Sequence, residues 1–120
     1  MRSTTTCNRG DVIVVNVPYS NHSGLKPRPA LVVSPAAFHR RLPDVIVCPI
    51  SSQPRYHRHP GPGDHPLGAW QGVGLRYPST VRVSKLLAVD KQIIKRVLGT
   101  VPPADLAGVD AALRSALGLA

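Results

Sequence analysis

Apolar and β-branched residues fall into short runs along the first half of the chain, and proline, glycine or polar residues bound each run. Runs of this length and composition are typical of β-strands. Three strands are predicted, over Asp11 to Val17, Pro29 to Pro35 and Asp44 to Ile50. Pro49 cannot donate a hydrogen bond to a sheet, so we expect it at an edge or a bulge that turns Ser51 and Ser52 out of the sheet.

Further along the chain the pattern alternates. From Thr80 to Ser84 it predicts a strand with two valines on one face and with Arg82 and Ser84 side by side on the other. Asp90 is a suitable N-cap for a short turn over the next six residues. Val97 to Val101 can form a last strand before two prolines.

The end of the chain has a helical period. Pro103 near its start, Asp105 in the first turn and Gly118 after the last turn are typical end signals of a helix. Apolar residues recur on one face of this helix, at Leu106, Val109, Leu113 and Leu117. The pattern predicts an amphipathic helix that packs on the sheet, and the fold class is therefore β-rich α+β.

Two segments lack such patterns. Residues 1–9 are rich in serine and threonine without an apolar core, and we expect a flexible tail there, followed by a single domain over residues 10–120. Gln53 to Gly74 is rich in proline, glycine and histidine. It predicts a long mobile loop with at most a short strand or turn near Leu67 to Trp70.

Length and composition set limits on the class of protein. A chain of 120 residues should bury roughly 65% of its unfolded surface, which is enough for one core without disulfides. Its two cysteines, Cys7 and Cys48, show no metal or disulfide spacing, and the chain shows neither a signal peptide nor a membrane span. These features predict a cytoplasmic protein, and we assign no cofactor and no membrane partner.

The charge is strongly positive. Fifteen lysines and arginines oppose six aspartates, which gives a formal net charge of +9. Such an excess favours a polyanion or an acidic protein as partner, although a solvated basic surface is the simpler alternative. The positions argue for a partner, because most of the basic residues lie before, between or within the predicted strands while the terminal helix carries only Arg114.

One arginine in this set is held by its neighbours. Pro27 and Pro29 fix their own φ angles, and Pro29 also disfavours the helical conformation at Arg28. The guanidinium of Arg28 should therefore extend from a stiff strand beside Ser51, an arrangement that suits an anion. The alternatives are an arginine paired with a carboxylate and a serine whose hydroxyl satisfies backbone groups.

Several segments together resemble a known family. They are Arg9-Gly-Asp-Val-Ile-Val-Val, the loop from His22 to Arg28, Arg28-Pro-Ala-Leu-Val-Val-Ser-Pro-Ala-Ala-Phe38, Cys48-Pro-Ile-Ser-Ser52, Gly72-Val-Gly-Leu75, Pro78-Ser-Thr-Val-Arg82, Val89-Asp-Lys91 and the leucine-rich terminal helix. With these segments the chain is similar, over residues 9–119, to the PemK/Kid and MazF toxins of bacterial toxin–antitoxin pairs. Each segment alone is weak, and their common order and spacing make the match specific.

The resemblance implies a fold, an activity and partners. The implied fold is a half-open, twisted antiparallel β-barrel with a C-terminal helix. The implied activity is metal-independent, sequence-selective cleavage of single-stranded RNA, by attack of the 2′-hydroxyl with arginine stabilisation. The implied partners are the RNA substrate, a second copy in a homodimer, and a cognate antitoxin, whose acidic segment should cover the basic face.

The resemblance also implies catalytic residues. Arg28 and Ser51 match the family's arginine and hydroxyl residue, His22 matches a loop histidine that some members carry, and Arg82 matches a strand arginine. The family's aspartate two residues after that arginine is Ser84 here, and its loop glutamate is Ser23. The carboxylate base is therefore missing, so either His22 or a polarised serine acts as the base, or the protein cuts slowly or only binds RNA.

Further residues are expected to contact the substrate, namely Ser52, Arg55, Ser84 and Trp70. Trp70 could stack on a base, but a single tryptophan beside a proline- and glycine-rich loop more often packs at the edge of a core. His57, His59 and His65 lack the ordered spacing of a metal site, and no metal is assigned.

Two rival functions remain open on the sequence. One is a non-enzymatic toxin of the CcdB type, which shares this fold and binds gyrase through the last residues of its helix; here Leu117-Gly-Leu-Ala120 contains no aromatic residue. The other is a catalytically weak module that binds RNA or DNA, which the serine at position 84 favours.

Overall fold

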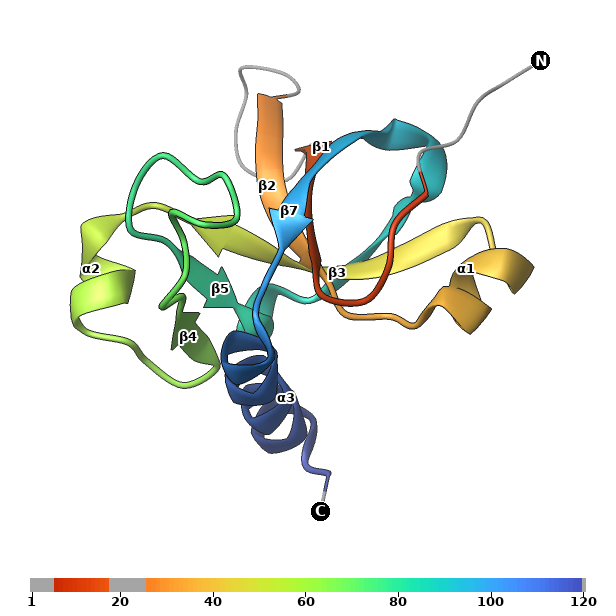
Figure 1. The fold of residues 1–120 in the computed structure, drawn as a ribbon. Coiled ribbons are helices and arrows are strands. Elements are labelled where there is room, and N and C mark those ends of the chain that lie inside the picture. The colour runs from red at the N-terminus through yellow and green to blue at the C-terminus, as the bar shows by residue number, and fades with distance from the viewer. Residues whose placement is uncertain (1–5, 18–25, 120) are drawn as a thin grey trace.

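A computed structural model describes residues 6–17 and 26–119 of the chain (Figure 1). Three helices, two 3-10 turns and seven strands are assigned within these residues. In chain order they are β1 (Asp11–Val17), β2 (Lys26–Val32), α1 (Ala36–Arg41), β3 (Asp44–Ser51), α2 (Pro54–Arg58), β4 (Asp64–Pro66), β5 (Thr80–Arg82), η1 (Val83–Lys85), β6 (Leu87–Asp90), η2 (Lys91–Ile93), β7 (Ile94–Thr100) and α3 (Pro103–Leu117).

All the strand pairs are antiparallel. The sheet runs in the order β4-β5-β3-β2-β1-β7, and β6 pairs with the first half of β3. The strands at the two ends, β4 and β7, do not pair with each other, so the barrel stays open. The predicted half-open antiparallel barrel with a C-terminal helix is therefore confirmed.

Strand β3 connects both parts of the sheet, and this explains where Pro49 lies. One edge of β3 pairs with β6 over Asp44 to Val47 and with β5 at Ile50 and Ser51. Cys48 and Pro49 lie where this edge passes from one partner to the other. A proline is tolerated there because its missing N–H interrupts no ladder on that edge. After this point β3 ends, with Ser51 half-buried and Ser52 exposed.

Strand β2 begins three residues earlier than predicted, at Lys26. Its first residues pair only with β1, because β3 joins from Ala30 on. Pro27 and Pro29 thus lie in a strand with one open edge, where a residue without an N–H is tolerated. Arg28 lies between them opposite Val15, so the predicted extended segment is confirmed.

The two faces of the sheet are buried in separate hydrophobic clusters. One cluster lies within the curve of the barrel and is built from Cys7, Ile13, Val15, Ala30, Val32, Val45, Val47, Val89 and Ile94. The other lies between the sheet and α3 and is built from Val12, Leu31, Cys48, Ile50, Leu67, Val73, Val81, Val83, Val101 and Val109. Neighbouring residues of β1 and β2 alternate between the clusters, as expected for strands buried on both faces.

Helix α3 lies beneath the strands and carries the C-terminal end away from them (Figure 1). Val109 is fully buried, and Leu106 and Leu113 pack against the second cluster. Leu117, which was predicted on the same face, is 54% exposed because the helix extends past the sheet. Gly118 ends the helix in the left-handed conformation, as the sequence predicted.

The prediction of a long irregular loop over residues 53–74 was wrong in part. Pro54 starts the short helix α2, and Asp64 starts β4, which pairs with β5. The rest of the segment is held by backbone hydrogen bonds such as Leu67 N to Ser79 O, 2.9 Å. Proline suits the first turn of a helix, and the glycines at positions 61 and 63 lie in the turn before β4, so the composition that suggested a loop serves two short elements.

Two other boundaries also differ from the predictions. β5 ends at Arg82, and Val83 to Lys85 form a 3-10 turn. Asp90 caps η2 as predicted, by accepting a hydrogen bond from the N–H of Gln92 at 2.8 Å, but this turn is shorter than expected and β7 begins at Ile94.

Residues 7–9, which we expected in a flexible tail, pack against the barrel. Cys7 is 6% exposed and belongs to the first cluster. Arg9 donates from Nε to the carbonyl of Val33 and forms an ion pair with Asp110 of α3. None of the helices among the described residues has the length and apolar character needed to cross a membrane.

Candidate active site

An open cavity of about 830 Å³ lies at the side of the barrel. Its walls come from β1, β2, the end of β3, α2, residues 74–79, β5, η1, β6 and β7. Val14 and Pro29 line it, and by strand alternation they share a sheet face with Val12 and Leu31 of the second cluster. The cavity therefore continues the apolar face of the sheet beyond the part that the second cluster covers.

The charged residues that line this cavity are all basic. Among the described residues they are Arg28, Arg76, Arg82, Lys85 and Arg96. No aspartate, histidine or cysteine is found in the described part of the lining. A concave surface with one sign of charge concentrates the oppositely charged ligand, so the cavity is suited to a polyanion.

Arg28 of β2 is among the residues that line this cavity. It is half-buried, and within the described residues it forms no ion pair and no hydrogen bond through its guanidinium. The alternative reading, in which a carboxylate neutralises this arginine, therefore has no support in the described part of the chain. A guanidinium without a protein partner keeps its whole fork of donors for a ligand.

Ser51 and Ser52, at the end of β3, also line the cavity. The Oγ atom of Ser51 accepts a hydrogen bond of 3.2 Å from the N–H of Gln53. This contact is the backbone role that the sequence left open for Ser51. The hydroxyl proton is still available for donation to a ligand, because only the acceptor side of the oxygen is used.

Arg82 is held at two points. Its Nε donates to Oδ1 of Asp64 at 2.6 Å, and its guanidinium carbon lies 3.7 Å from the centroid of the Tyr56 ring. The Asp64 side chain is only 4% exposed, and its other oxygen accepts from the N–H of Gly61. Burial alone would lower the pKa of Arg82, but the contacts with Tyr56 and Asp64 raise it, so the guanidinium stays charged.

Two guanidinium groups contact Tyr56. Arg55 donates from its Nη2 to the Tyr56 hydroxyl at 2.8 Å, and its guanidinium carbon lies 4.7 Å from the ring centroid. Arg82, followed by Arg55, lowers the pKa of the Tyr56 phenol from its ordinary value of 10.0, because both cations favour the phenolate. Tyr56 lines the cavity, whereas Arg55 is exposed and outside the lining.

Besides Arg55, two other residues predicted to contact the substrate lie outside the cavity lining. Ser84 is part of the 3-10 turn after β5, packs near Gly63 and does not line the cavity, so its expected position beside Arg82 was wrong. The strand ends two residues before Ser84, so the alternation does not reach it. Trp70 packs against the second hydrophobic cluster, which is the structural role that the sequence also allowed. His22 lies outside the described residues.

The residues of this site that sequence reasoning missed include Tyr56, Asp64, Arg76, Lys85 and Arg96. Asp64 had a signal, because it is the only acidic residue between Asp44 and Asp90 in a segment rich in cations. Tyr56 had none, since a short helix inside a proline-rich segment gives no periodic pattern. Arg96 was placed in a turn because the start of β7 was predicted three residues too late.

Neither a metal site nor a reactive thiol is found among the described residues. No group of three or more histidine, cysteine or aspartate side chains is close enough there to hold a metal ion. Both cysteines are buried, and burial raises the pKa of Cys48 to about 12. The Cys48 thiol is therefore protonated at neutral pH and is a poor nucleophile.

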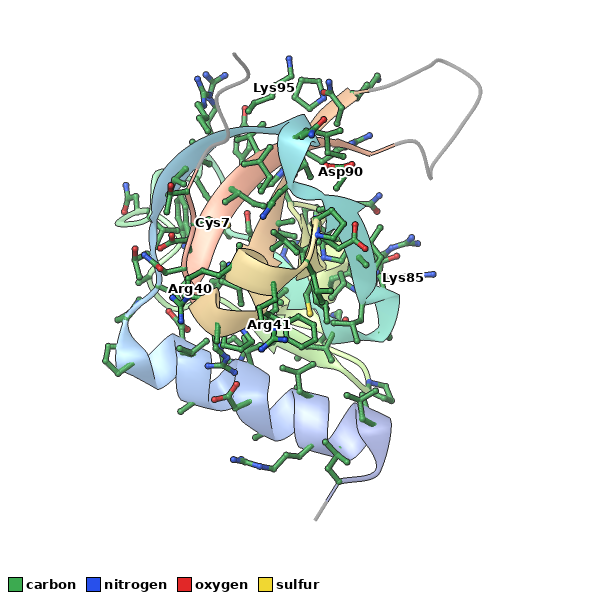
Figure 2. The ribbon with its side chains drawn as sticks, turned by 90° about the vertical axis from the view of Figure 1, so that its right-hand side faces the viewer. Cys7, Arg40, Arg41, Lys85, Asp90 and Lys95 are labelled. Atoms are coloured by element: carbon green, nitrogen blue, oxygen red, sulfur yellow. The ribbon has the colours of Figure 1, made fainter. Side chains whose placement is uncertain are left out.

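Basic residues are not confined to the cavity. Figure 2 looks at the molecule from the side of α1, where Arg40 and Arg41 extend from the helix, and both are exposed. They are absent from the cavity lining. These arginines contribute to the net charge and provide a reference surface for testing what is particular to the cavity.

The fold and the cavity together define a class of protein: a small, half-open antiparallel barrel with a basic cavity suited to a polyanion. The family model for the PemK-like, MazF-like toxin of type II toxin–antitoxin systems matches residues 8–117. The chain belongs to this family. The comparison with curated proteins found no match.

The fold of the chain is also similar to that of solved toxin and endoribonuclease structures. One similar structure is an endoribonuclease in complex with its cognate antitoxin from a mycobacterial species, with 25% identity, a TM-score of 0.77, and 96% of this chain and 98% of that chain covered. Another is a MazE-MazF complex from Deinococcus radiodurans, with 26% identity, a TM-score of 0.75, and 95% and 97% covered. Mycobacterium tuberculosis toxin MazF-mt6, at 19% identity and a TM-score of 0.73 over 92% and 98%, shows the same fold.

Proposed function

We propose that this protein is a toxin endoribonuclease that cleaves single-stranded RNA without a metal ion. The observation that carries the proposal is the position of Arg28, which has no protein partner among the described residues and lies with Ser51 in a cavity whose charged lining is entirely basic there. The family match and the similarity to a mycobacterial endoribonuclease support the same activity.

Cleavage of RNA by its own 2′-hydroxyl places specific demands on a site. The hydroxyl must lose a proton, the leaving 5′-oxygen must gain one, and the negative charge that grows on the phosphate oxygens must be stabilised. The products are a 2′,3′-cyclic phosphate and a 5′-hydroxyl. Arginine suits the third demand, because its fork binds phosphate in bidentate fashion and keeps its charge.

In this reaction Arg28 binds the scissile phosphate and stabilises its developing charge. Ser51, at the end of the neighbouring strand β3, donates its hydroxyl proton to a phosphate oxygen. Arg82, oriented by Asp64 and by the Tyr56 ring, supplies a second cation. Ser52 and Arg96 also line the cavity and contact the neighbouring nucleotides. The lining thereby provides positive charge of the kind that a divalent cation supplies in other nucleases.

The basic cavity is also a surface for an inhibitor. An antitoxin with an acidic segment would neutralise the protein by covering the cavity, and the mycobacterial and Deinococcus relatives are both seen with antitoxins. A homodimer is carried over from the family resemblance. Binding of the antitoxin should weaken as salt is added, because the charge excess of +9 drives it. Light scattering at micromolar concentration tests the dimer.

The test of the proposed function is cleavage of a long single-stranded RNA in EDTA by the wild type, Arg28→Ala and Arg40→Ala. Loss of one well-placed donor to a developing charge typically costs about 10²–10³ in rate. The cleavage rate of Arg28→Ala should therefore be lower than that of the wild type by this factor. Arg40→Ala removes the same group from the exposed surface of α1 and should cut like the wild type. The fragments should carry 5′-hydroxyl ends.

The outcomes separate this function from its rivals. Intact RNA with the wild type, together with toxicity in cells that Arg28→Ala preserves, would contradict the proposal and favour a toxin that acts by binding a protein. Equal cleavage by the wild type and Arg28→Ala would remove Arg28 from the mechanism. RNA that is bound but not cut would indicate a binding module.

A further inference from the structure

The cavity lacks an ordinary general base in its described lining. Carboxylates, imidazoles and thiols are absent there, and the one carboxylate nearby, Asp64, is buried behind Arg82 and bonded to it. The titratable groups that do line the cavity are the four arginines, Lys85, Tyr56 and Tyr77. An arginine does not lose its proton in a protein, which leaves Lys85 and the two tyrosines as groups that can exchange one.

Tyr56 differs from Tyr77 in its surroundings. The Tyr56 hydroxyl receives a hydrogen bond from Arg55 of the same helix, and its ring lies against Arg82 of β5. Both neighbours favour the deprotonated oxygen and lower the pKa of the phenol. Tyr77 is 60% exposed, and no guanidinium contact to its ring or hydroxyl is found among the described residues.

The groups around Tyr56 form a connected chain. Asp64 of β4 holds Arg82, Arg82 lies over the ring, and Arg55 holds the hydroxyl, so three elements fix one phenol at the cavity wall. Arg28, Arg76 and Lys85 add positive charge around the same cavity. A hydrogen bond donated by Arg55 uses one lone pair of the phenol oxygen and leaves another for a proton. This arrangement presents a base rather than a purely structural tyrosine.

We propose that Tyr56 is the general base that removes the proton from the attacking 2′-hydroxyl of the RNA, an assignment that rests on the proposed endoribonuclease function. The phenolate oxygen takes the 2′ proton while the 2′-oxygen forms its bond to phosphorus. The bond from phosphorus to the 5′-oxygen breaks, and this oxygen takes a proton from water. Tyr56 then returns its proton to solvent, and no oxidant, reductant or metal is required.

The experiment compares the wild type with Tyr56→Phe over a range of pH. Phenylalanine keeps the ring beneath Arg82 and removes only the hydroxyl. The wild-type rate should rise with pH up to the pKa of Tyr56, and Tyr56→Phe should lose this rise together with about 10²–10⁴-fold in rate. Tyr77→Phe removes the same atom from the same cavity and should keep the rising limb.

A second measurement titrates the phenol without RNA. The chain has three tyrosines, so the ultraviolet absorbance titration of the wild type minus that of Tyr56→Phe gives the curve of Tyr56 alone. Its midpoint should lie below 10 and coincide with the midpoint of the rate profile. Arg55→Gln removes one cation beside the phenol and should move both midpoints to higher pH.

The outcomes for this proposal are distinct from those for the function. If the wild type cuts RNA and Tyr56→Phe retains its rate and its pH profile, Tyr56 is not the base and the ribonuclease stands. A phenol that titrates at or above 10 would overturn the proposal in the same way. If the wild type leaves RNA intact in the EDTA assay, the proposed function itself fails, and the assignment of Tyr56 fails with it.

Discussion

Two neighbouring residues of β4 form side-chain pairs in two different regions of the molecule. Asp64 pairs with Arg82 at the cavity, and His65 lies 3.0 Å from the carboxylate of Asp105 in the first turn of α3. Successive residues of a strand point to opposite faces, so one short strand serves both regions. Both pairs join an aspartate to a basic side chain, but only the first has its cation at the surface of a cavity.

The second pair closes a structural contact. Asp105 also accepts hydrogen bonds from the backbone N–H groups of Gly68 and Ala69, at 2.9 and 3.1 Å. His65 lies so close to Gly108 that an added Cβ there would come within 2.2 Å of the ring. Both oxygens of the Asp105 carboxylate therefore accept hydrogen bonds from groups within the protein. Its cluster joins β4, the segment after it and α3, and it contributes stability where the Asp64 cluster contributes a positioned cation.

The largest effect is expected from a change at Asp64, which tests whether its pair with Arg82 positions a cation for catalysis. Asp64→Asn removes the charge that orients Arg82, and misplacing a catalytic group by about 1 Å can cost on the order of 10²-fold. We expect RNA cleavage to fall by about ten- to a hundredfold, with a changed turnover number as the main effect. Steady-state kinetics on a short RNA measure this. Asp44→Asn, at the exposed start of β3, is the matched control and should keep the wild-type rate.

An Asp64→Asn protein that cuts RNA at the wild-type rate would contradict a role for the Asp64 and Arg82 pair in positioning. A protein that only loses thermal stability would place Asp64 in the same structural class as Asp105. Circular dichroism at the assay temperature separates a misplaced arginine from an unfolded protein, because only the unfolded protein changes the spectrum.

A change at Asp105 tests whether the second pair contributes to the stability of the fold. Asp105→Asn weakens a buried acceptor of two backbone hydrogen bonds, and such losses cost about 1–3 kcal/mol. We expect the free energy of unfolding in urea to fall by that amount. Asp110→Asn on the same helix is the control. Its ion pair with Arg9 is partly exposed, so its loss should change stability by less than about 1 kcal/mol. Equal losses from both variants would contradict the comparison.

The same carboxylate predicts an effect of pH. Burial alone would raise the pKa of Asp105, but the hydrogen bonds from Gly68, His65 and Ala69 outweigh burial and hold the pKa below its ordinary 3.8. A pKa that is lower in the folded state contributes stability that is complete above the unfolded pKa and is lost as pH falls through the folded value. The stability gap between wild type and Asp105→Asn should therefore narrow below pH 3.8. Urea unfolding at a series of acidic pH values measures the gap, and a gap that stays constant to low pH would contradict this account.

These clusters also show what the sequence could and could not predict. Local patterns predicted β1, the extended segment around Arg28, the cap at Asp90 and the helix α3, because each depends on residues close together in the chain. The contacts from Asp64 to Arg82 and from His65 to Asp105 join residues 18 and 40 positions apart. They depend on the pairing of β4 with β5, and a three-residue strand in a proline- and glycine-rich segment gives no signal of its own.

The wrong prediction for Ser84 has a similar cause, because the local pattern did not show where β5 ends. Alternation over five residues predicted that Ser84 would lie beside Arg82, and the strand stopped at Arg82. Ser84 therefore lies outside the cavity lining. Asp64, from a different strand, provides a carboxylate to Arg82 in space. This contact joins residues 18 positions apart, and it cannot be found from the sequence without the strand pairing.

The smallest expected effect lies on β5, the strand that pairs with β4. Thr80 of β5 is opposite Ser51 on one side and Pro66 on the other, and its hydroxyl is fully buried without a hydrogen-bond partner among the described residues. A buried hydroxyl without a partner is destabilising, so Thr80→Val should raise the free energy of unfolding by about 1 kcal/mol. Urea unfolding measures this. Because Thr80 does not line the cavity, RNA cleavage should be unchanged. A loss of cleavage would instead indicate that Thr80 is needed to position the cavity residues.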